Sequence, residues 1–287
     1  MNNRPKRVAA IHDLSGFGRC SLSVILPTLS AMGVQVCPVP TAILSSHTGG
    51  LGEVEFRDLT SFIVPCLNHY KSLGLEFECI YSGFLGSQEQ IDHCLEFFHT
   101  YQDALAVVDP VMGDHGKAYR TYTEAMRSRL GELVQVADVI TPNLTEACML
   151  LKIPYISQGL SRTQAKSLLA QLGELGPNYV VITGVPMASG SIANVGYDKQ
   201  NNSYWIVPCD YVPVSYPGTG DIFASVLTGG FLTGDSLPIA MGRATYFVEQ
   251  CIKTTFSYST DTRHGVMLEK ELAVLGNRCN IKGYSLL

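Results

Sequence analysis

The sequence lacks any apolar run that could cross a lipid bilayer. A membrane-spanning helix needs roughly 18 or more consecutive apolar residues, whereas the first apolar run covers only residues 8–11. That run is also too short for a secretory signal peptide, which needs a longer apolar stretch before a cleavage site with small residues. These absences predict a cytoplasmic protein without a membrane partner.

A basic stripe is absent as well. Only 16% of the 287 residues are charged, the formal net charge is -5 and the pI is about 5.8. A nucleic-acid-binding surface needs clustered Lys and Arg, and the small group Arg4, Lys6 and Arg7 is typical of a solvated terminus. Hydrophobic residues make up 46%, which indicates a globular chain with a sizeable core. We therefore expect no nucleic-acid partner.

Two common binding motifs are missing. The nine cysteines include no CxxC pair, so we expect them to be reduced core residues rather than metal ligands. No GxxxxGK[ST] stretch occurs, which excludes a Walker-type phosphate loop. Residues 12–19 contain two glycines after a strand but lack the full GxGxxG pattern, so they give little support to a dinucleotide fold.

Short β-rich apolar runs alternate with amphipathic runs along the whole chain, and this pattern is typical of a parallel sheet covered by helices. We expect one domain over residues 1–287, of the α/β class, with a doubly wound, mostly parallel sheet and helices on both faces. The predicted strands are 8–11, 34–39, 77–81, 105–109, 138–140 and 179–183, followed by a hairpin at 191–198 and 204–208. The predicted helices are 20–32, 56–73, 88–101, 123–136, 145–151, 162–172, 221–230 and 237–254.

Polar residues follow several predicted strands, at 12–13, 81–83, 109–110, 141–143 and 183–184. In open α/β sheets, ligands bind outside the carboxyl ends of the strands. The sequence therefore predicts one shared cleft at that edge of the sheet.

The most informative segment is PGTGD at residues 217–221, where an apolar helix begins. The free N–H groups and positive dipole end of a helix start bind anions, and glycine allows a sharp bend there. Asp221 is an unusual negative charge in such a place. It is either a helix cap or a general base that takes a proton from a substrate hydroxyl during phosphoryl transfer.

Two further segments offer oxygen ligands for a cation. Asn143 and Glu146 lie three apart and share a helix face, which suits Mg²⁺, although the same spacing is that of a capping box. Both roles can coexist. Asp109 ends a buried strand and Asp114 follows in a glycine-containing loop, where they either help hold a hydrated cation or form an ordinary turn.

The polar segment SSHTGG at residues 45–50 follows a strand. It offers the donors and acceptors that a small aromatic substrate with a ring nitrogen and hydroxyl groups requires. A mobile surface loop is the alternative interpretation.

These segments, in this order, resemble the ribokinase-like superfamily, and within it the pyridoxal (pyridoxine/pyridoxamine) kinases. The matching words are HDLSGFGRCS, LSSHTGG, YSGFLGS, DPVMGD, TPNLTEA, VVITG and PGTGD. The resemblance implies an ATP- and Mg²⁺-dependent kinase that phosphorylates the 5′-hydroxymethyl group of a vitamin B6 vitamer. It also implies a homodimer and, near the ATP site, a monovalent cation such as K⁺.

The resemblance also implies a role for individual residues. Asp221 is expected to be the catalytic base. The anion hole is expected at Gly218, Thr219 and Gly220. The magnesium environment is expected at Asp109 and Glu146. The residues expected along ATP are Asp114, Thr141, Asn143 and Thr183. The residues expected around the vitamer are Ser15, His47, Thr48 and Tyr81.

The sequence differs from other members of the superfamily in two ways that affect the expected substrate. The loop DLSGFGRCS differs from the valine- and tyrosine-containing segment of animal-type and several bacterial pyridoxal kinases, which leaves the preferred vitamer open. No β-rich excursion with a GGN-type stretch follows the first strand and helix, so we expect no sugar-kinase lid and a flat aromatic substrate. The alternatives are a hydroxymethylpyrimidine (phosphate) kinase of thiamine synthesis and a non-catalytic vitamer- or nucleotide-binding protein.

Overall fold

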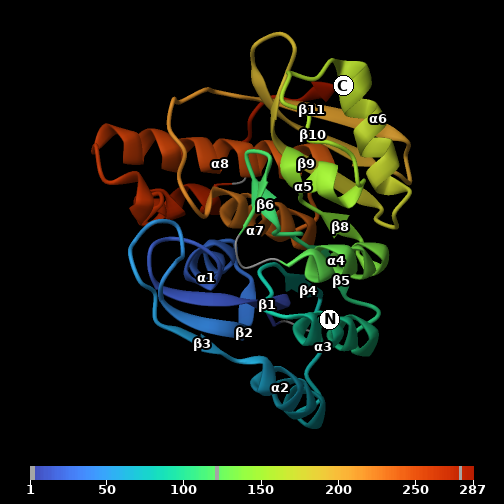
Figure 1. Cartoon of the computed structure of the whole chain (residues 1–287), viewed down its shortest axis with the longest axis vertical. Coiled ribbons are helices and arrows are strands. Elements are labelled where there is room, and N and C mark those ends of the chain that lie inside the picture. Colours follow the sequence, from blue (N-terminus) through green and yellow to red (C-terminus); the bar gives the residue numbers. More distant parts are fainter. Residues whose placement is uncertain (1–3, 120–122, 278–279) are drawn as a thin grey trace.

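One ten-stranded sheet runs through the computed structural model, which describes residues 4–119, 123–277 and 280–287 (Figure 1). Its parallel strands, in spatial order, are β2 (Gln35–Ser46), β1 (Arg7–Phe17), β4 (Cys79–Ser82), β5 (Leu105–Val108), β8 (Val139–Ile140) and β9 (Tyr179–Pro186). The antiparallel strands at its edges are β3 (Phe56–Asp58) beside β2, and β10 (Ile192–Asp198), β11 (Ser203–Cys209) and β12 (Ser285–Leu286) beyond β9. The expected mostly parallel α/β sheet is confirmed.

Helices pack on both faces of the sheet (Figure 1). One face carries α1 (Leu22–Ala31), α7 (Thr219–Leu232) and α8 (Leu237–Ser257). The other carries α2 (Thr60–Ser72), α3 (Gln88–Thr100), α4 (Glu124–Val136), α5 (Leu144–Leu150) and α6 (Arg162–Gly173). The start of β1 is continuously apolar because both of its faces are buried. Val8 and Ala10 pack into the core on one side of the sheet, and Ala9 and Ile11 pack into the core on the other.

Helix starts follow the side-chain signals in the sequence. The Ser87 side chain accepts the N–H of Gln90 at 3.2 Å at the start of α3. Thr123 caps α4 in the same way. These caps satisfy backbone donors that have no partner within the helix, so the local sequence fixes where the helices begin.

The first two strands are longer than predicted, because segments that looked like loops pair with each other. Past a bulge between His12 and Leu14, β1 continues alongside β2 until Phe17 pairs with Ser46. Polar and glycine residues there hid the strand from a pattern-based prediction. The residues that follow the first predicted strand are therefore part of the sheet as far as Phe17.

The predicted helix at 56–73 is wrong at its start. Residues 56–58 form β3, since they pair with 42–44 of β2, and α2 begins only at Thr60. Pro65 lies inside α2 and does not end it. A two-stranded hairpin of β6 (Gly113–Asp114) and β7 (Lys117–Ala118) was not predicted either.

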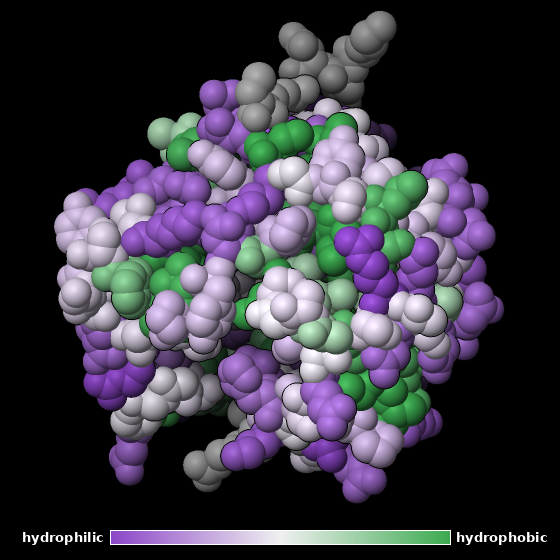
Figure 2. All heavy atoms as spheres, turned by 90° about the horizontal axis from the view of Figure 1, so that it is seen from above, coloured by the Kyte–Doolittle hydropathy of each residue, from purple (hydrophilic) through white to green (hydrophobic). Residues whose placement is uncertain are grey.

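The chain ends in short helical turns and a peripheral strand. The turns that follow α8 are η1 (Thr262–His264), η2 (Leu268–Lys270) and η3 (Leu272–Gly276). On the face that Figure 2 shows, hydrophobic residues form separate patches between hydrophilic ones. Within the described residues, none of the helices combines the length and hydrophobicity needed to cross a membrane.

Candidate active site

The carboxyl ends of the central strands bring the predicted site residues side by side. Backbone hydrogen bonds continue past the strand ends and set this order. The N–H of Asp109 donates to Ser82 O at 2.8 Å, that of Thr141 to Val108 O at 3.3 Å, and that of Thr183 to Pro142 O at 3.0 Å. Residues from four strands therefore meet at one edge of the sheet.

The start of α7 lies against the turn between β1 and α1. Gly218 caps the helix with φ 78°, a left-handed conformation, and a Cβ at this position would lie 1.9 Å from the carbonyl oxygen of Arg19. Gly220 is exposed, and a Cβ there would meet no atom within 4 Å. The first turn of α7 is thus tightly packed on one side and open on the other, where its free N–H groups can meet an anion.

Asp221 joins this turn to the same segment. Its Oδ2 accepts the backbone N–H of Ser21 at 2.8 Å. Burial raises the pKa of Asp221 to about 7, the Ser21 N–H opposes this shift, and the charge of Asp13 adds to it. A carboxylate with a pKa near neutrality can accept a proton and release it again under physiological conditions. The geometry gives Asp221 the properties of a general base.

Ser21 presents its N–H from an uncommon backbone conformation. Its φ is 49°, a region that non-glycine residues adopt rarely and at a cost of about 1–3 kcal/mol. Strained residues of this kind are concentrated at active sites. The strain is consistent with a local geometry fixed by the need to place the donor at Asp221.

Asp109 and Glu146 form a buried acidic pair beside these strand ends. They are 6% and 4% exposed. Burial raises the pKa of both carboxyls, and the charges of Glu146 and then Asp221 raise that of Asp109 further. No ion pair in the described part of the chain includes either residue. Such uncompensated buried charge favours a bound cation.

Glu146 also completes the capping box that the sequence allowed. Its Oε2 accepts the N–H of Asn143 at 2.9 Å, and the Asn143 side chain accepts the N–H of Glu146 at 3.0 Å. Its Oε1 accepts the N–H of Met112 at 3.1 Å. A carboxylate has about four acceptor positions, so the cap leaves lone pairs for a metal.

The donor set fits Mg²⁺ held together with a nucleotide. The described residues contain no group of three or more Asp, Glu, His or Cys side chains that could hold a metal ion by themselves. Mg²⁺ does not require one, because it keeps several waters and binds through one or two carboxylates plus substrate phosphates. Asp109 and Glu146 match that requirement.

The residues predicted along ATP lie next to this pair. The side-chain N–H of Asn143 donates to Gly113 O at 2.8 Å, which ties the β6–β7 hairpin and its Asp114 to α5. Asn143 also forms an isolated parallel bridge with Thr183. Thr141, Asn143 and Thr183 therefore lie at the ends of β8 and β9, and Asp114 lies in the hairpin bonded to Asn143.

The predicted vitamer residues differ in how accessible their polar atoms are. The N–H of Gly49 donates to Nδ1 of His47 at 2.9 Å, and Nε2 lies 2.6 Å from Arg263 O. Both ring nitrogens of His47 are therefore engaged by backbone, and only its carbon edge or face can meet a ligand. Thr48 is exposed, whereas Ser15 is buried and donates its hydroxyl to Asp13 at 3.1 Å.

Tyr81 needs a correction. Its side chain has no exposed surface and packs edge-on against the buried His12 ring, with centroids 4.4 Å apart. It therefore supports the site from within the core and offers no surface to a substrate. Phe84, three residues further on, is aromatic, only half-buried and lies just past the end of β4, which makes it a better candidate for stacking against a ring.

One residue near the carboxylates escaped prediction. Burial is the largest cause of the raised pKa of Tyr119. Four nearby carboxylates raise this pKa further: Glu146, Asp114, Asp221 and Asp109. The β6–β7 hairpin brings Tyr119 back to these carboxylates, and no sequence pattern indicates this hairpin. Asp13, one of the polar residues expected to follow the first strand, is buried at the β1 bulge.

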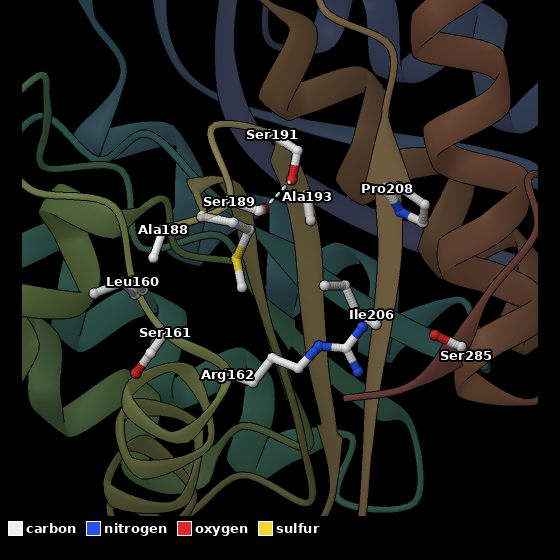
Figure 3. A pocket seen from close by; sticks show the side chains of 11 residues that line it. Leu160, Ser161, Arg162, Ala188, Ser189, Ser191, Ala193, Ile206, Pro208 and Ser285 are labelled. Carbon is white, nitrogen blue, oxygen red and sulfur yellow. Dashed lines mark hydrogen bonds between the residues drawn. The ribbon is translucent and has the colours of Figure 1, made fainter.

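A separate cavity of about 260 Å³ opens between α6, the β9–β10 connection and β12 (Figure 3). Arg162 points into it and donates to Leu286 O at 3.2 Å. None of the predicted site residues lines it. The cavity is therefore distinct from the strand-end site.

Comparisons with known proteins identify relatives of this chain. The family model described as phosphomethylpyrimidine kinase matches residues 25–267. Among curated relatives, a pyridoxal kinase of Corynebacterium diphtheriae is 25% identical over 93% of this chain and 95% of its own length. A hydroxymethylpyrimidine/phosphomethylpyrimidine kinase of Mycobacterium leprae is 26% identical, over 88% of this chain and 90% of its own length.

Two solved structures are similar to nearly the whole chain. A candidate phosphomethylpyrimidine kinase of Bacteroides thetaiotaomicron, in a crystal form with pyridoxal, is 44% identical with a TM-score of 0.94, over 99% of this chain and 100% of that one. A pyridoxal kinase of Lactobacillus plantarum is 30% identical with a TM-score of 0.86, over 94% and 96% of the two chains.

We predict different stability effects for alanine at two nearby glycines, Gly218 and Gly220. Gly218→Ala places a Cβ against the Arg19 carbonyl and forces a left-handed alanine, so it should lower the free energy of unfolding by at least about 1–3 kcal/mol. Gly220→Ala, the matched control, meets open space and should change stability little. Urea unfolding of both variants measures this, and equal stabilities would contradict the close approach.

Proposed function

The chain belongs to the phosphomethylpyrimidine kinase family, and on that premise we propose that it is a single-domain kinase over residues 1–287 that phosphorylates the 5′-hydroxymethyl group of a vitamin B6 vitamer with ATP. The observation that carries the proposal is the position of Asp221. It lies at the first turn of α7, beside free N–H groups and close enough to Asp109 to raise the pKa of that carboxyl.

The choice of substrate is supported by relatives. The Bacteroides homologue crystallised with pyridoxal is 44% identical over nearly the whole chain, and a pyridoxal kinase is 30% identical. A hydroxymethylpyrimidine kinase is the second candidate, since the family model and the Mycobacterium relative carry that name. Both substrates are flat heterocycles with a hydroxymethyl group, so the same site chemistry serves either.

The residues of the chain divide the reaction between them. Asp221 accepts the proton of the substrate hydroxyl as its oxygen bonds to the terminal phosphorus of ATP, while the bond from that phosphorus to the ADP oxygen breaks. The N–H groups of Gly218, Thr219 and Gly220 stabilise the negative charge on the transferring group. Asp114, Thr141, Asn143 and Thr183 would bind along the triphosphate.

Asp109 and Glu146 would hold Mg²⁺, which when bound supplies positive charge for the phosphates. A monovalent cation such as K⁺ near ATP stays a prediction, and no step depends on it. Ser15, His47 and Thr48 would surround the vitamer ring, with His47 fixed by the backbone contacts described above.

We also propose a cytoplasmic homodimer. All eight cysteines in the described part of the chain are free thiols, as a reducing compartment allows. The edge strand β3 and its neighbours expose Phe17, Ile43 and Phe56, which are 52%, 45% and 41% exposed. Exposed apolar side chains at a sheet edge favour contact with another protein surface.

Replacing the proposed base should remove turnover without removing nucleotide binding. We expect Asp221→Asn to lower kcat by about 10²–10⁴-fold, the usual contribution of general base catalysis, with ATP affinity nearly unchanged. The assay uses MgATP with pyridoxal, pyridoxamine, pyridoxine and hydroxymethylpyrimidine, and identifies products by mass spectrometry. Asp103→Asn, on an exposed residue before β5, is the matched control.

That assay distinguishes the two candidate functions and also tests Asp221 as the base. Faster phosphorylation of hydroxymethylpyrimidine than of every vitamer would favour the second function. Vitamer binding without phosphate transfer by the wild-type chain would indicate a binding protein. Near wild-type turnover by Asp221→Asn would contradict the role of Asp221.

The pH dependence of the wild-type enzyme should report the pKa of Asp221. A base must be ionised to accept a proton, and burial raises its pKa to about 7. We expect kcat/KM to fall about tenfold per pH unit below pH 7 and to level off above it. A profile that stays flat down to pH 5 would show that no group with this pKa takes part.

Glu146→Gln should raise the magnesium requirement. Glutamine can still accept the N–H of Asn143 in the capping box, so the fold is kept while one negative charge is lost. We expect the Mg²⁺ concentration for half-maximal activity to rise about tenfold or more. Glu96→Gln, on an exposed position of α3, is the control; an unchanged magnesium titration for Glu146→Gln would exclude the role.

A further inference from the structure

The turn η1, which follows α8, is bonded to the loop at residues 47–50, and the proposed reaction gives it no role. Nη1 of Arg263 donates to Gly50 O at 3.0 Å. The carbonyl oxygen of the same arginine lies 2.6 Å from Nε2 of His47. Both ends of the loop are therefore tied to one residue that lies 213 positions beyond Gly50 in the chain.

The contacts of His47 select one form of its ring. The N–H of Gly49 donates to Nδ1 at 2.9 Å, so Nδ1 carries no proton in this arrangement. Nε2 then carries the ring proton and donates it to Arg263 O. A Cβ at Gly18 would lie 2.1 Å from Cδ2 of the ring, and a Cβ at Gly49 would lie 2.8 Å from Cε1. The ring therefore fills a slot that two glycine backbones and Arg263 form together.

Arg263 is itself held by its neighbours. Oδ1 of Asp261 accepts the backbone N–H of Arg263 at 2.9 Å and its Nε at 3.0 Å. The ring of His264 packs edge-on against Phe17, with centroids 5.0 Å apart, and the His264 carbonyl accepts Nη1 of Arg19 at 3.3 Å. Residues 261–265 therefore present Arg263 to the loop in one orientation and are anchored on the turn between β1 and α1.

Thr48 is the residue that this arrangement leaves accessible. It is exposed, and its carbonyl accepts the N–H of Gly50 at 3.0 Å, which makes a tight turn. Its neighbour His47 and the Gly50 carbonyl are both bonded to Arg263. The direction in which the Thr48 side chain points is therefore set by residues 261–265.

We propose that residues 261–265 form a clamp on the loop at 47–50, and that Arg263 is a positioning residue which orders Thr48 for the heteroaromatic alcohol. This inference rests on the proposed function. Arg263 acts through the loop and not by touching the substrate. A loop that is ordered before the substrate arrives loses less conformational freedom on binding, so the substrate binds more tightly. The residues expected along ATP lie at the ends of β8 and β9 and in the β6–β7 hairpin, so the effect is confined to the ring substrate.

The competing role for Arg263 is that of an ordinary surface arginine which only stabilises the fold. Arg129 on α4 is a matched control for that role. Its Nη1 also donates to a backbone carbonyl, that of Gln88, at 3.3 Å, and its guanidinium also forms ion pairs with carboxylates. Ion pairs near the surface contribute little to stability, so alanine at either position should leave the chain folded.

The test compares Arg263→Ala, Arg263→Lys and Arg129→Ala with the wild-type chain. Steady-state kinetics give kcat and KM for each vitamer, for hydroxymethylpyrimidine and for ATP. Thermal unfolding gives the stability of each variant. Hydrogen–deuterium exchange of the backbone N–H groups of Gly49 and Gly50, followed by NMR without substrate, reports the order of the loop even where no phosphate is transferred.

We expect Arg263→Ala to raise the KM of the ring substrate about tenfold, as for a binding loop that must be ordered by its ligand. The ATP KM and kcat should stay within about twofold of wild type, and exchange at Gly49 and Gly50 should become about tenfold faster or more. Arg263→Lys keeps a donor for Gly50 O and should recover part of the loss. Arg129→Ala should match wild type in KM and exchange, with a melting temperature close to that of Arg263→Ala.

Four results would overturn the proposal. They are an unchanged KM for the ring substrate in Arg263→Ala, an equal rise in Arg129→Ala, unchanged exchange at Gly49 and Gly50, and failure of Arg263→Ala to fold. If the wild-type chain phosphorylates none of the substrates, the proposed function fails, and the exchange rates still decide whether Arg263 holds the loop: faster exchange in Arg263→Ala supports the clamp and equal exchange excludes it.

Discussion

The contact between the β1–α1 turn and the first turn of α7 determines the rest of the site. Gly218 approaches the Arg19 carbonyl so closely that no side chain fits between them, and two residues on, the N–H of Ser21 holds the carboxylate of Asp221. This packing contact therefore fixes the positions of both the free N–H groups of α7 and the Asp221 carboxylate. It also brings the N-terminal loop, which carries Asp13, into the electrostatic field of α7.

Burial of negative charge is the second constraint. Asp13, Asp109 and Glu146 are buried, and burial is the largest cause of the raised pKa in each of them, as it is in Asp221. Charges kept out of water without cations cost free energy, which ligands carrying positive charge can offset. By our proposal, Mg²⁺ supplies this positive charge beside Asp109 and Glu146.

The order of strands and helices could be predicted well from the sequence because hydrophobic periodicity, helix caps and turn-forming glycines are local signals. The capping box of Asn143 and Glu146 forms as its sequence spacing allowed. The extended ends of β1 and β2 were missed because their pairing is with each other and not with an apolar core. The start of the helix predicted at 56–73 failed for the same reason, since pairing with β2 makes residues 56–58 a strand.

The places of Asp221 and Asp109 in the structure could be predicted from residue type and position at a helix or strand end, and the structure brings the two carboxyls near each other. Burial and three-dimensional proximity decided the rest. Tyr81 followed a strand like the other candidates, but it is enclosed under α7. Tyr119 is near the carboxylates only because a hairpin brings it there, and no spacing in the sequence encodes that.

The most direct test of this account is an NMR titration of the Asp221 carboxyl carbon in the free enzyme, assigned by comparison with Asp221→Asn. A titration midpoint near pH 7 would agree with a base poised by burial and by the neighbouring charge of Asp13. A midpoint near 3.8, the ordinary value for aspartate, would mean that the carboxylate is solvated and that the buried acidic field does not exist.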